Sequence, residues 1–189
     1  AGLTTRSSRR RSAARLNSGV SPLETSAEIS ACRQYRYALR RKWADGPQIL
    51  FVMLNPSTAD ETVDDPTIRR CIGFSKSWGF GSLAVGNLFA LRTPSPAVLK
   101  RSVAPVGPQN DSWLQELQRS AALVVAAWGN HGSFLGRSGT VRQLLSDPHT
   151  LGLTKLGEPR HPLYVPSAAQ PLSWRANNSF KPKPLRGSA

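Results

Sequence analysis

The stretch FVMLNPSTAD, residues 51–60, places an apolar run directly before Asn-Pro-Ser-Thr. A proline cannot continue a central strand, and the residue before it is driven out of the helical region. We therefore predict that a buried strand over residues 49–54 ends at Asn55, which stands at the carboxyl end of that strand. Ligands bind at the carboxyl ends of strands in open α/β sheets.

Four apolar runs of strand length alternate with helical patterns. The runs are ILFVML (49–54), SLAVGNLFA (82–90), ALVVAAW (122–128) and TLGLT (150–154). Apolar residues at three-to-four spacing predict helices from Asp65-Pro66 to just before Gly79, over 109–120 and over 138–145. This order predicts an α/β fold, with a mainly parallel sheet and helices on both faces. The segment QYRYALRRKW, residues 34–43, alternates well enough to be an extra antiparallel edge strand.

The charge of the chain is concentrated at its ends. The 189 residues include 25 Lys and Arg and 11 Asp and Glu, a net charge of +14. Residues 1–42 carry ten basic and two acidic residues, residues 43–165 carry eleven and nine, and residues 166–189 carry four and none. Such ends favour a nucleic-acid partner over a membrane, because no run approaches the ~18 apolar residues of a membrane span. They are equally consistent with solvated tails that only keep the protein soluble.

The composition predicts one domain between two tails. Residues 1–30 are rich in Arg, Ser and Ala, which is typical of an organelle transit peptide or a disordered basic arm. We expect a processed or recombinant chain, because it begins at Ala1 and its only Met is Met53. Residues 167–189 are predicted to be a Pro-rich basic tail, which leaves residues 31–166 as the domain.

Several familiar sites are excluded. The two cysteines, Cys32 and Cys71, form neither a disulfide framework nor a four-ligand metal site, so we expect a reducing intracellular compartment: the cytoplasm of a bacterium or an organelle matrix. GFGSLA, residues 79–84, has the spacing of a dinucleotide fingerprint but precedes a strand, so we interpret it as a turn. Neither a G-x-x-x-x-G-K-[ST] nor an H-E-x-x-H motif occurs.

An acidic cluster precedes the first predicted helix. It comprises Asp60, Glu61, Asp64 and Asp65. Carboxylates could bind magnesium here. Asp before a proline at the first helical position is more often a helix cap, and we favour that interpretation.

Three polar segments lie at or after the ends of predicted strands: LNPST (54–58) after the first, GNLFALRTPSP (86–96) around the end of the second and GEPRHPLYVP (157–166) after the fourth. On a parallel sheet all three lie at the carboxyl edge, where separate loops can surround one ligand. Each also has a structural interpretation, since Asn-Pro is a common turn, Asn87 can bond a neighbouring backbone and His161 can be structural. Their convergence predicts one site.

Between about residues 33 and 166, the chain closely resembles a bacterial family known as domain of unknown function 1643. The strings that carry this resemblance are LNPSTAD, DDPTIRRC, GNLFALR, VGPQND, AAWGNHG and LGLTKLGEPRHPLY. The family name implies no activity.

The three polar segments also resemble motifs of the uracil-DNA glycosylase superfamily. This resemblance implies a three-layer α/β/α sandwich around a four-stranded parallel sheet. MLNPS (53–57) is similar to the first motif, Gly-x-Asn-Pro-Gly, which implies that Asn55 orients the attacking water. GNLFALRTP (86–94) is similar to the second-strand segment of a thermophile branch, which implies that Asn87 recognises the base. His161-Pro162-Leu163 is similar to the final His-Pro-Ser motif, which implies that His161 donates to the departing base oxygen.

The chain departs from these motifs at three positions. Met53 and Ser57 replace the glycines of the first motif, and Leu163 replaces the final serine. The iron–sulfur cluster of the thermophile branch needs four cysteine ligands, which this chain cannot supply. We expect no cofactor and no metal.

The resemblance predicts hydrolysis of an N-glycosidic bond, either of a base in DNA or RNA or of a modified nucleoside, with Asn55 and His161 as catalytic residues. The predicted base-binding residues are Pro56, Ser57, Asn87, Phe89, Leu163 and Tyr164, and the predicted backbone-binding residues are Arg92, Arg160, Arg9, Arg10 and Arg11. Leu163 and Tyr164 can assist base flipping, or can instead be core residues under the loop. The alternative class is a non-catalytic nucleic-acid-binding or ribonucleoprotein-associated protein that retains the fold.

Overall fold

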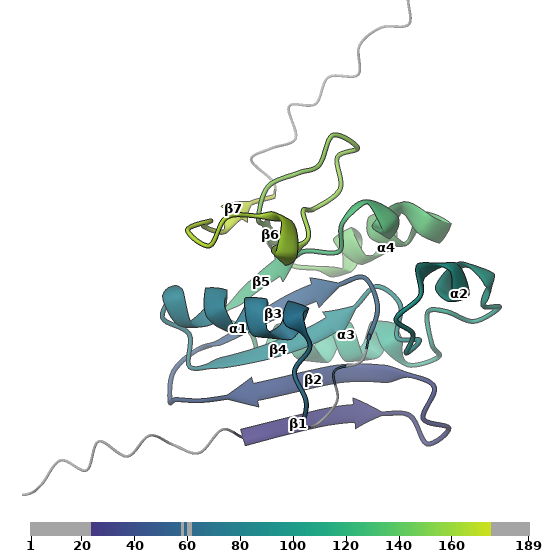
Figure 1. Cartoon of the computed structure of the whole chain (residues 1–189), viewed down its shortest axis with the longest axis horizontal. Helices are drawn as coiled ribbons and strands as arrows, with labels where there is room; N and C mark the ends of the chain where they lie inside the picture. Colours follow the sequence, from purple (N-terminus) through teal and green to yellow (C-terminus); the bar gives the residue numbers. More distant parts are fainter. Residues whose placement is uncertain (1–23, 58, 60–61, 175–189) are drawn as a thin grey trace, which may run out of the picture.

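Parallel strands occupy the middle of the sheet in the computed structural model, which describes residues 24–57, 59 and 62–174 (Figure 1). In spatial order they are β4 (Ser82–Asn87), β3 (Gln48–Met53), β5 (Leu123–Ala126) and β6 (His149–Thr150). Alternate residues of β3 enter two different cores, so both faces of the strand are buried and its run is continuously apolar. The prediction of these parallel strands is confirmed, although the fourth is only two residues long.

Three further strands make the sheet larger than predicted. β2 (Arg36–Lys42) pairs antiparallel with β4, β1 (Glu24–Ile29) pairs with β2, and β7 (Leu172–Ser173) pairs with β6. Within the described residues, the sheet therefore has seven strands in the order β1-β2-β4-β3-β5-β6-β7, and the prediction of four strands is wrong in number. The predicted edge strand exists as β2, but β1 covers its outer side.

The domain also extends beyond its predicted limits of 31 and 166. β1 lies in the segment predicted to be an arm, and β7 lies in the segment predicted to be a tail. Trp174 is 5% exposed, and its ring packs edge-on against Trp128 at 5.5 Å between ring centroids. The domain includes at least residues 24–174. Arg9, Arg10 and Arg11 lie outside the described residues, and their role stays a prediction.

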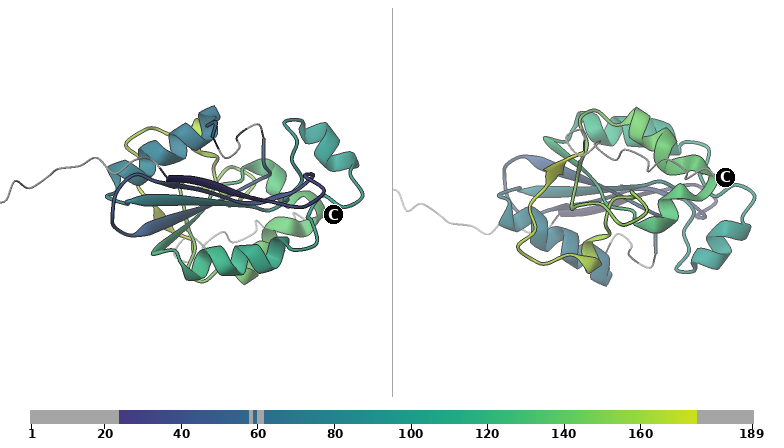
Figure 2. Two further views of the ribbon diagram at one scale, coloured as in Figure 1. Left: turned by 90° about the horizontal axis from the view of Figure 1, so that it is seen from below. Right: turned by 90° about the horizontal axis from the view of Figure 1, so that it is seen from above.

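Helices cover both faces of the sheet (Figure 2). α1 (Pro66–Ser77) lies on one face, and α3 (Asn110–Arg119) and α4 (Arg137–Leu144) lie on the other. None of the helices in the described part of the chain has the length and apolar character needed to cross a membrane.

Local signals explain where the helices begin. Asp65 Oδ1 accepts a hydrogen bond from Ile68 N at 2.8 Å, which confirms its predicted role as the cap of α1. The short helix α2 (Pro96–Arg101) was not predicted, although Ser95 caps it in the same way. The described residues also include two 3-10 segments, η1 (Asn130–Gly136) and η2 (Pro162–Tyr164).

Gly86 allows α3 to pack closely on β4, which leads to a test. A Cβ built at Gly86 would lie 2.7 Å from Leu114 Cδ2. Gly86→Ala should therefore lower the free energy of unfolding by about 1–3 kcal/mol, because the buried side chains of Leu114 and Leu117 must repack or α3 must shift. The matched control is Gly73→Ala in α1, where a Cβ meets nothing within 4 Å and helix propensity should raise stability by about 1 kcal/mol. Urea unfolding measures both variants, and equal effects would contradict the packing.

Candidate functional site

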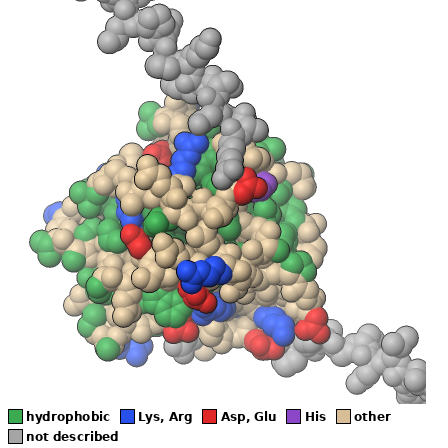
Figure 3. Space-filling model, turned by 180° about the vertical axis from the view of Figure 1, so that it is seen from behind, with side chains coloured by type: hydrophobic (Ala, Val, Ile, Leu, Met, Phe, Trp, Pro, Cys, Tyr) green, Lys and Arg blue, Asp and Glu red, His purple; other side chains and the backbone are tan. Residues whose placement is uncertain are grey.

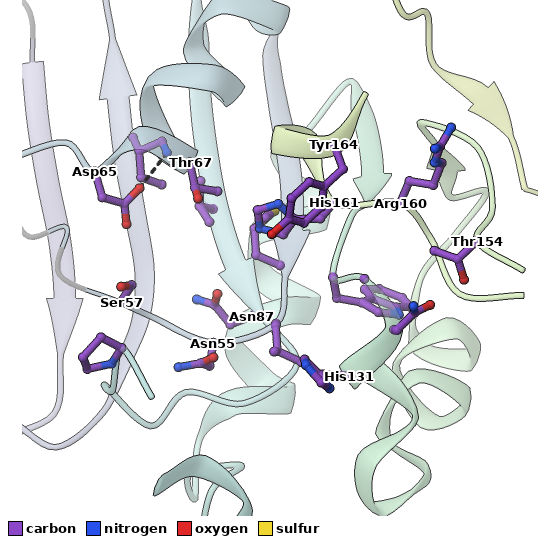
Figure 4. A pocket seen from close by; sticks show the side chains of 18 of the residues that line it. Asn55, Ser57, Asp65, Thr67, Asn87, His131, Thr154, Arg160, His161 and Tyr164 are labelled. Carbon is purple, nitrogen blue, oxygen red and sulfur yellow. Dashed lines mark hydrogen bonds between the residues drawn. The ribbon is translucent and has the colours of Figure 1, made fainter. Parts of the chain in front are cut away.

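A cleft of about 710 Å³ lies at the carboxyl edge of the parallel strands (Figure 4). Its lining includes Asn55 just after β3, Asn87 at the end of β4, Trp128 after β5 and His161 in the segment after β6. Segments far apart in the sequence meet here because parallel strands end on the same edge. The prediction that Asn55, Asn87 and His161 face one cleft is confirmed.

The side-chain amide of Asn55 ties two loops together. Its Nδ2 donates to Thr93 O at 2.7 Å and to Pro56 O at 3.0 Å, and Thr93 N donates to Pro56 O at 3.0 Å. The opposite orientation of the amide would place its oxygen against carbonyl oxygens. The amide nitrogen is thereby committed to the backbone, and Oδ1 is the atom that can accept a hydrogen bond from a ligand.

Asn87 presents a buried amide that no group in the described part of the chain satisfies. The residue is 1% exposed, and within the described residues neither Nδ2 nor Oδ1 has a hydrogen-bond partner. Leaving a buried polar group unpaired costs about 1–3 kcal/mol. Since Nδ2 donates and Oδ1 accepts, a ligand edge with an acceptor beside a donor would satisfy both atoms.

Side chains from α3 and α4 bind the backbone carbonyls of Asn87 and Leu88. Asn110, which is fully buried in α3, donates from Nδ2 to Asn87 O at 2.9 Å and to Leu88 O at 3.0 Å. Arg137 Nε also donates to Leu88 O, at 2.8 Å, and the same guanidinium forms an ion pair with Asp111. These contacts explain the Asn and Asp of the VGPQND string, whose role the sequence did not reveal.

His161 is a neutral hydrogen-bond donor. Its Nδ1 accepts from Leu163 N at 3.3 Å, which assigns the ring proton to Nε2. Burial lowers the pKa of His161, and the Asp65 carboxylate opposes this more weakly by raising it. The ring is therefore neutral at pH 7, and the centroid of the Tyr164 ring lies 5.6 Å from its own.

The other predicted site residues divide into two groups. Ser57, Arg160 and Tyr164 line the cleft together with the three residues already described. The residues outside the lining are Pro56, Phe89, Leu163 and Arg92.

Phe89 is the clearest error among the predicted base-binding residues. It is fully buried and packs against Phe134 at 5.5 Å between ring centroids, because the chain has turned into the core after β4. Arg92 instead donates to Arg33 O at 3.2 Å. Leu163 and Tyr164 are 43% and 76% exposed, so the alternative that they are core residues is wrong.

Sequence reasoning missed the wall formed by the AAWGNHG string. Trp128 is 2% exposed, and its Nε1 donates to Glu158 Oε2 at 2.7 Å. A Cβ at Gly132 would overlap the Trp128 ring, so only glycine fits there. The same wall brings Asn130 and His131 to the cleft. Because the string begins at the end of the third predicted strand, the argument from the carboxyl edge could have found it.

The charged groups at the cleft are mainly basic. Among the described residues that line it, Arg36, Lys155 and Arg160 are basic and Asp65 is acidic. Asp64 is engaged elsewhere, in an ion pair with Arg41 at 2.9 Å. Across residues 24–57, 59 and 62–174, no three His, Cys, Asp or Glu side chains are grouped as a metal site. On the back of the molecule, by contrast, basic side chains lie next to acidic ones (Figure 3).

The fold and cleft define an α/β protein with a polar site at the carboxyl edge of its sheet. The chain belongs to the family described as a protein of unknown function (DUF1643), which matches residues 36–163. No match was found among curated proteins or among solved structures. The family description names no activity, so the resemblance to uracil-DNA glycosylases stays a prediction.

Titration of His161 tests its assignment. Because burial lowers the folded-state pKa, the unfolded chain binds more protons, and the stability gained from neutral His161 is lost as pH falls below about 6.5. NMR of the ring nitrogens should show a proton on Nε2 at pH 7, and His161→Gln should remove this part of the pH dependence of stability. A raised pKa or a proton on Nδ1 would contradict the assignment.

Replacing Asn110 tests the support of β4. Asn110→Leu keeps the size of the side chain but removes its bonds to Asn87 O and Leu88 O, so the free energy of unfolding should fall by about 2 kcal/mol. Asn130→Leu is the matched control, because Asn130 is exposed and should change stability by less than about 0.5 kcal/mol. Chemical denaturation measures both, and equal losses would argue against the support.

Proposed function

We propose that the cleft binds a nucleobase and hydrolyses the N-glycosidic bond that joins the base to its sugar, in nucleic acid or in a modified nucleoside. The proposal includes a glycosylase-like three-layer architecture in which the four parallel strands form the middle layer. The observation that carries it is the buried amide of Asn87, which has no partner among the described residues, in one cleft with Asn55 and the neutral donor His161.

Asn87 is assigned to base recognition. An asparagine amide forms two hydrogen bonds with a base edge that presents a donor beside an acceptor. Those two bonds would satisfy both polar atoms of Asn87, whereas a base without this edge would leave them buried and unpaired. Recognition is therefore expected to depend on the hydrogen-bonding edge of the base more than on its size.

The reaction assigns separate roles to Asn55 and His161. As the bond between the sugar C1′ and the base nitrogen breaks, positive charge develops on the sugar and the bonding electrons move to the base. Asn55 Oδ1 accepts a hydrogen bond from water and orients its oxygen toward C1′. His161 Nε2–H donates to the base oxygen on which negative charge collects. The water oxygen forms the new bond to C1′, and its released proton ends on the free base.

Single-turnover base release from labelled oligonucleotides tests these roles. Asn55→Ala and His161→Ala should each slow release about a hundredfold, or about 3 kcal/mol, while oligonucleotide affinity changes little. Asn55→Ala also breaks the bond to Thr93 O and should lower stability. Val141→Ala is the control for that effect, because Val141 is fully buried and does not line the cleft.

Other outcomes would assign the protein to another class. Asp65→Asn keeps a good helix cap and should retain base release. Loss of activity at Asp64 or Asp65 that added magnesium restores, with Asn55→Ala still active, would indicate a metal-dependent hydrolase. Binding of oligonucleotides without release of any base would indicate the non-catalytic nucleic-acid-binding class.

A further inference from the structure

Residues 152–160 form a hairpin beside the cleft, which we call the cleft hairpin; it is visible at the top of Figure 1. Its two legs meet through a bridge between Leu153 and Pro159, and Arg160 N donates to Gly152 O at 2.9 Å. Thr154 N closes the turn by donating to the carbonyl of Glu158 at 2.8 Å. These bonds give the hairpin a defined shape, although it contains no regular strand.

Glu158 fixes the cleft hairpin to the rest of the domain. Its Oε2 accepts from Trp128 Nε1 at 2.7 Å, and its Oε1 accepts from Ser138 Oγ at 2.9 Å. One carboxylate thus joins the hairpin to the segment after β5 and to α4. A ligand that binds a fixed hairpin loses less conformational entropy than one that must order a loose loop.

The hairpin presents positive charge that the protein does not neutralise. Lys155 and Arg160 are exposed, both line the cleft, and neither has an ion pair in the part of the chain that the structure describes. The Arg160 side chain extends away from Asn55 and Asn87 (Figure 4). Arg160 is therefore positioned to bind an anion outside the part of the cleft that Asn55 and Asn87 line. A neutral nucleoside carries no such anion.

The tip of the hairpin is apolar. Leu156 follows Lys155 in the turn and is 74% exposed. Tyr164, on the rim of the same cleft, is 76% exposed. An exposed apolar side chain beside cations suits nucleic acid, in which bases present apolar faces and phosphates present negative charge at short intervals.

We infer that the cleft hairpin binds the nucleic-acid strand next to the base that the cleft holds. Lys155 and Arg160 bind phosphates, and Leu156 packs against a neighbouring base that has left its stack. The ligand is therefore a polynucleotide and not a free nucleoside. This inference rests on the proposed function for the base in the cleft, and it adds the substrate class and the residues that select it.

Salt dependence separates the phosphate contacts from the apolar contact. The full chain and its variants are titrated with a fluorescent single-stranded oligonucleotide of mixed sequence at several salt concentrations, with thermal unfolding as the check on folding. Lys155→Ala/Arg160→Ala should reduce the slope of log affinity against log salt by about 1.4, because each phosphate contact contributes about 0.7 on single strands. Leu156→Ala should weaken binding about tenfold, because less apolar surface is buried against the base, and should leave the slope unchanged.

Matched controls come from the region of α2. Lys100→Ala/Arg101→Ala removes two exposed basic residues that do not line the cleft, and Val103→Ala truncates an apolar residue that is 102% exposed. These variants should bind like the wild type. Competition with an unlabelled nucleoside should displace the oligonucleotide only at concentrations at least a hundredfold above those of an unlabelled oligonucleotide.

Several results would overturn the inference. The first is that the wild type does not bind the oligonucleotide. The second is that Lys155→Ala/Arg160→Ala and Lys100→Ala/Arg101→Ala have equal salt slopes. The third is that Lys155→Ala/Arg160→Ala loses binding to phosphatidylserine vesicles but still binds the oligonucleotide as the wild type does. The assay measures binding without base release, so its outcome is independent of catalysis. A reduced salt slope in Lys155→Ala/Arg160→Ala, with no base release by the wild type, would support the hairpin inference and refute the glycosylase proposal. An unchanged slope in that variant, with base release by the wild type, would refute the hairpin inference and support the glycosylase proposal.

Discussion

Where parallel strands end, their peptide groups lose their partners in the ladder and must be satisfied by other groups. In this protein, side chains from separate segments take over at the carboxyl edge. Asn110 and Arg137 bind the carbonyls at the end of β4, and Asn55 binds the carbonyl of Thr93. The cleft is shaped by this requirement, because the same bonds that satisfy the backbone fix the loops around it. At this edge the side-chain amide of Asn87 is left without a hydrogen-bond partner among the described residues.

The sequence predicted the elements whose residues carry a strong signal, either a continuous apolar run or a helix-start motif. The three longer parallel strands are continuous apolar runs because helices cover both of their faces, and α1 begins at an Asp-Pro pair. β1 could not be predicted, since its ETSAEI sequence lies at the edge of the sheet with little burial. β7 has only two residues, too few for any period to appear. Both strands are defined by backbone pairing with a neighbour that sequence patterns do not reveal.

The candidate site was partly predictable for the same reason. Asn55, Asn87 and His161 follow apolar runs, so the topology alone brings them to one edge. Phe89 was misassigned because the sequence cannot show that the chain turns inward directly after β4. The contribution of Asn110 and Glu158 depends on contacts between segments more than twenty residues apart, and no local pattern predicts such contacts.

The packing of Trp174 bears on where the chain can be shortened. A fragment ending at residue 166, the limit suggested by composition, would still contain every residue that lines the cleft. It would lack Trp174, whose ring covers an edge of Trp128 and lies beneath the guanidinium of Arg142 at 4.4 Å. Such a fragment would therefore have all the cleft residues, but Trp128 would have lost its packing against Trp174. A fragment that keeps every lining residue therefore does not necessarily keep an intact site, because Trp174 supports the cleft from outside its lining.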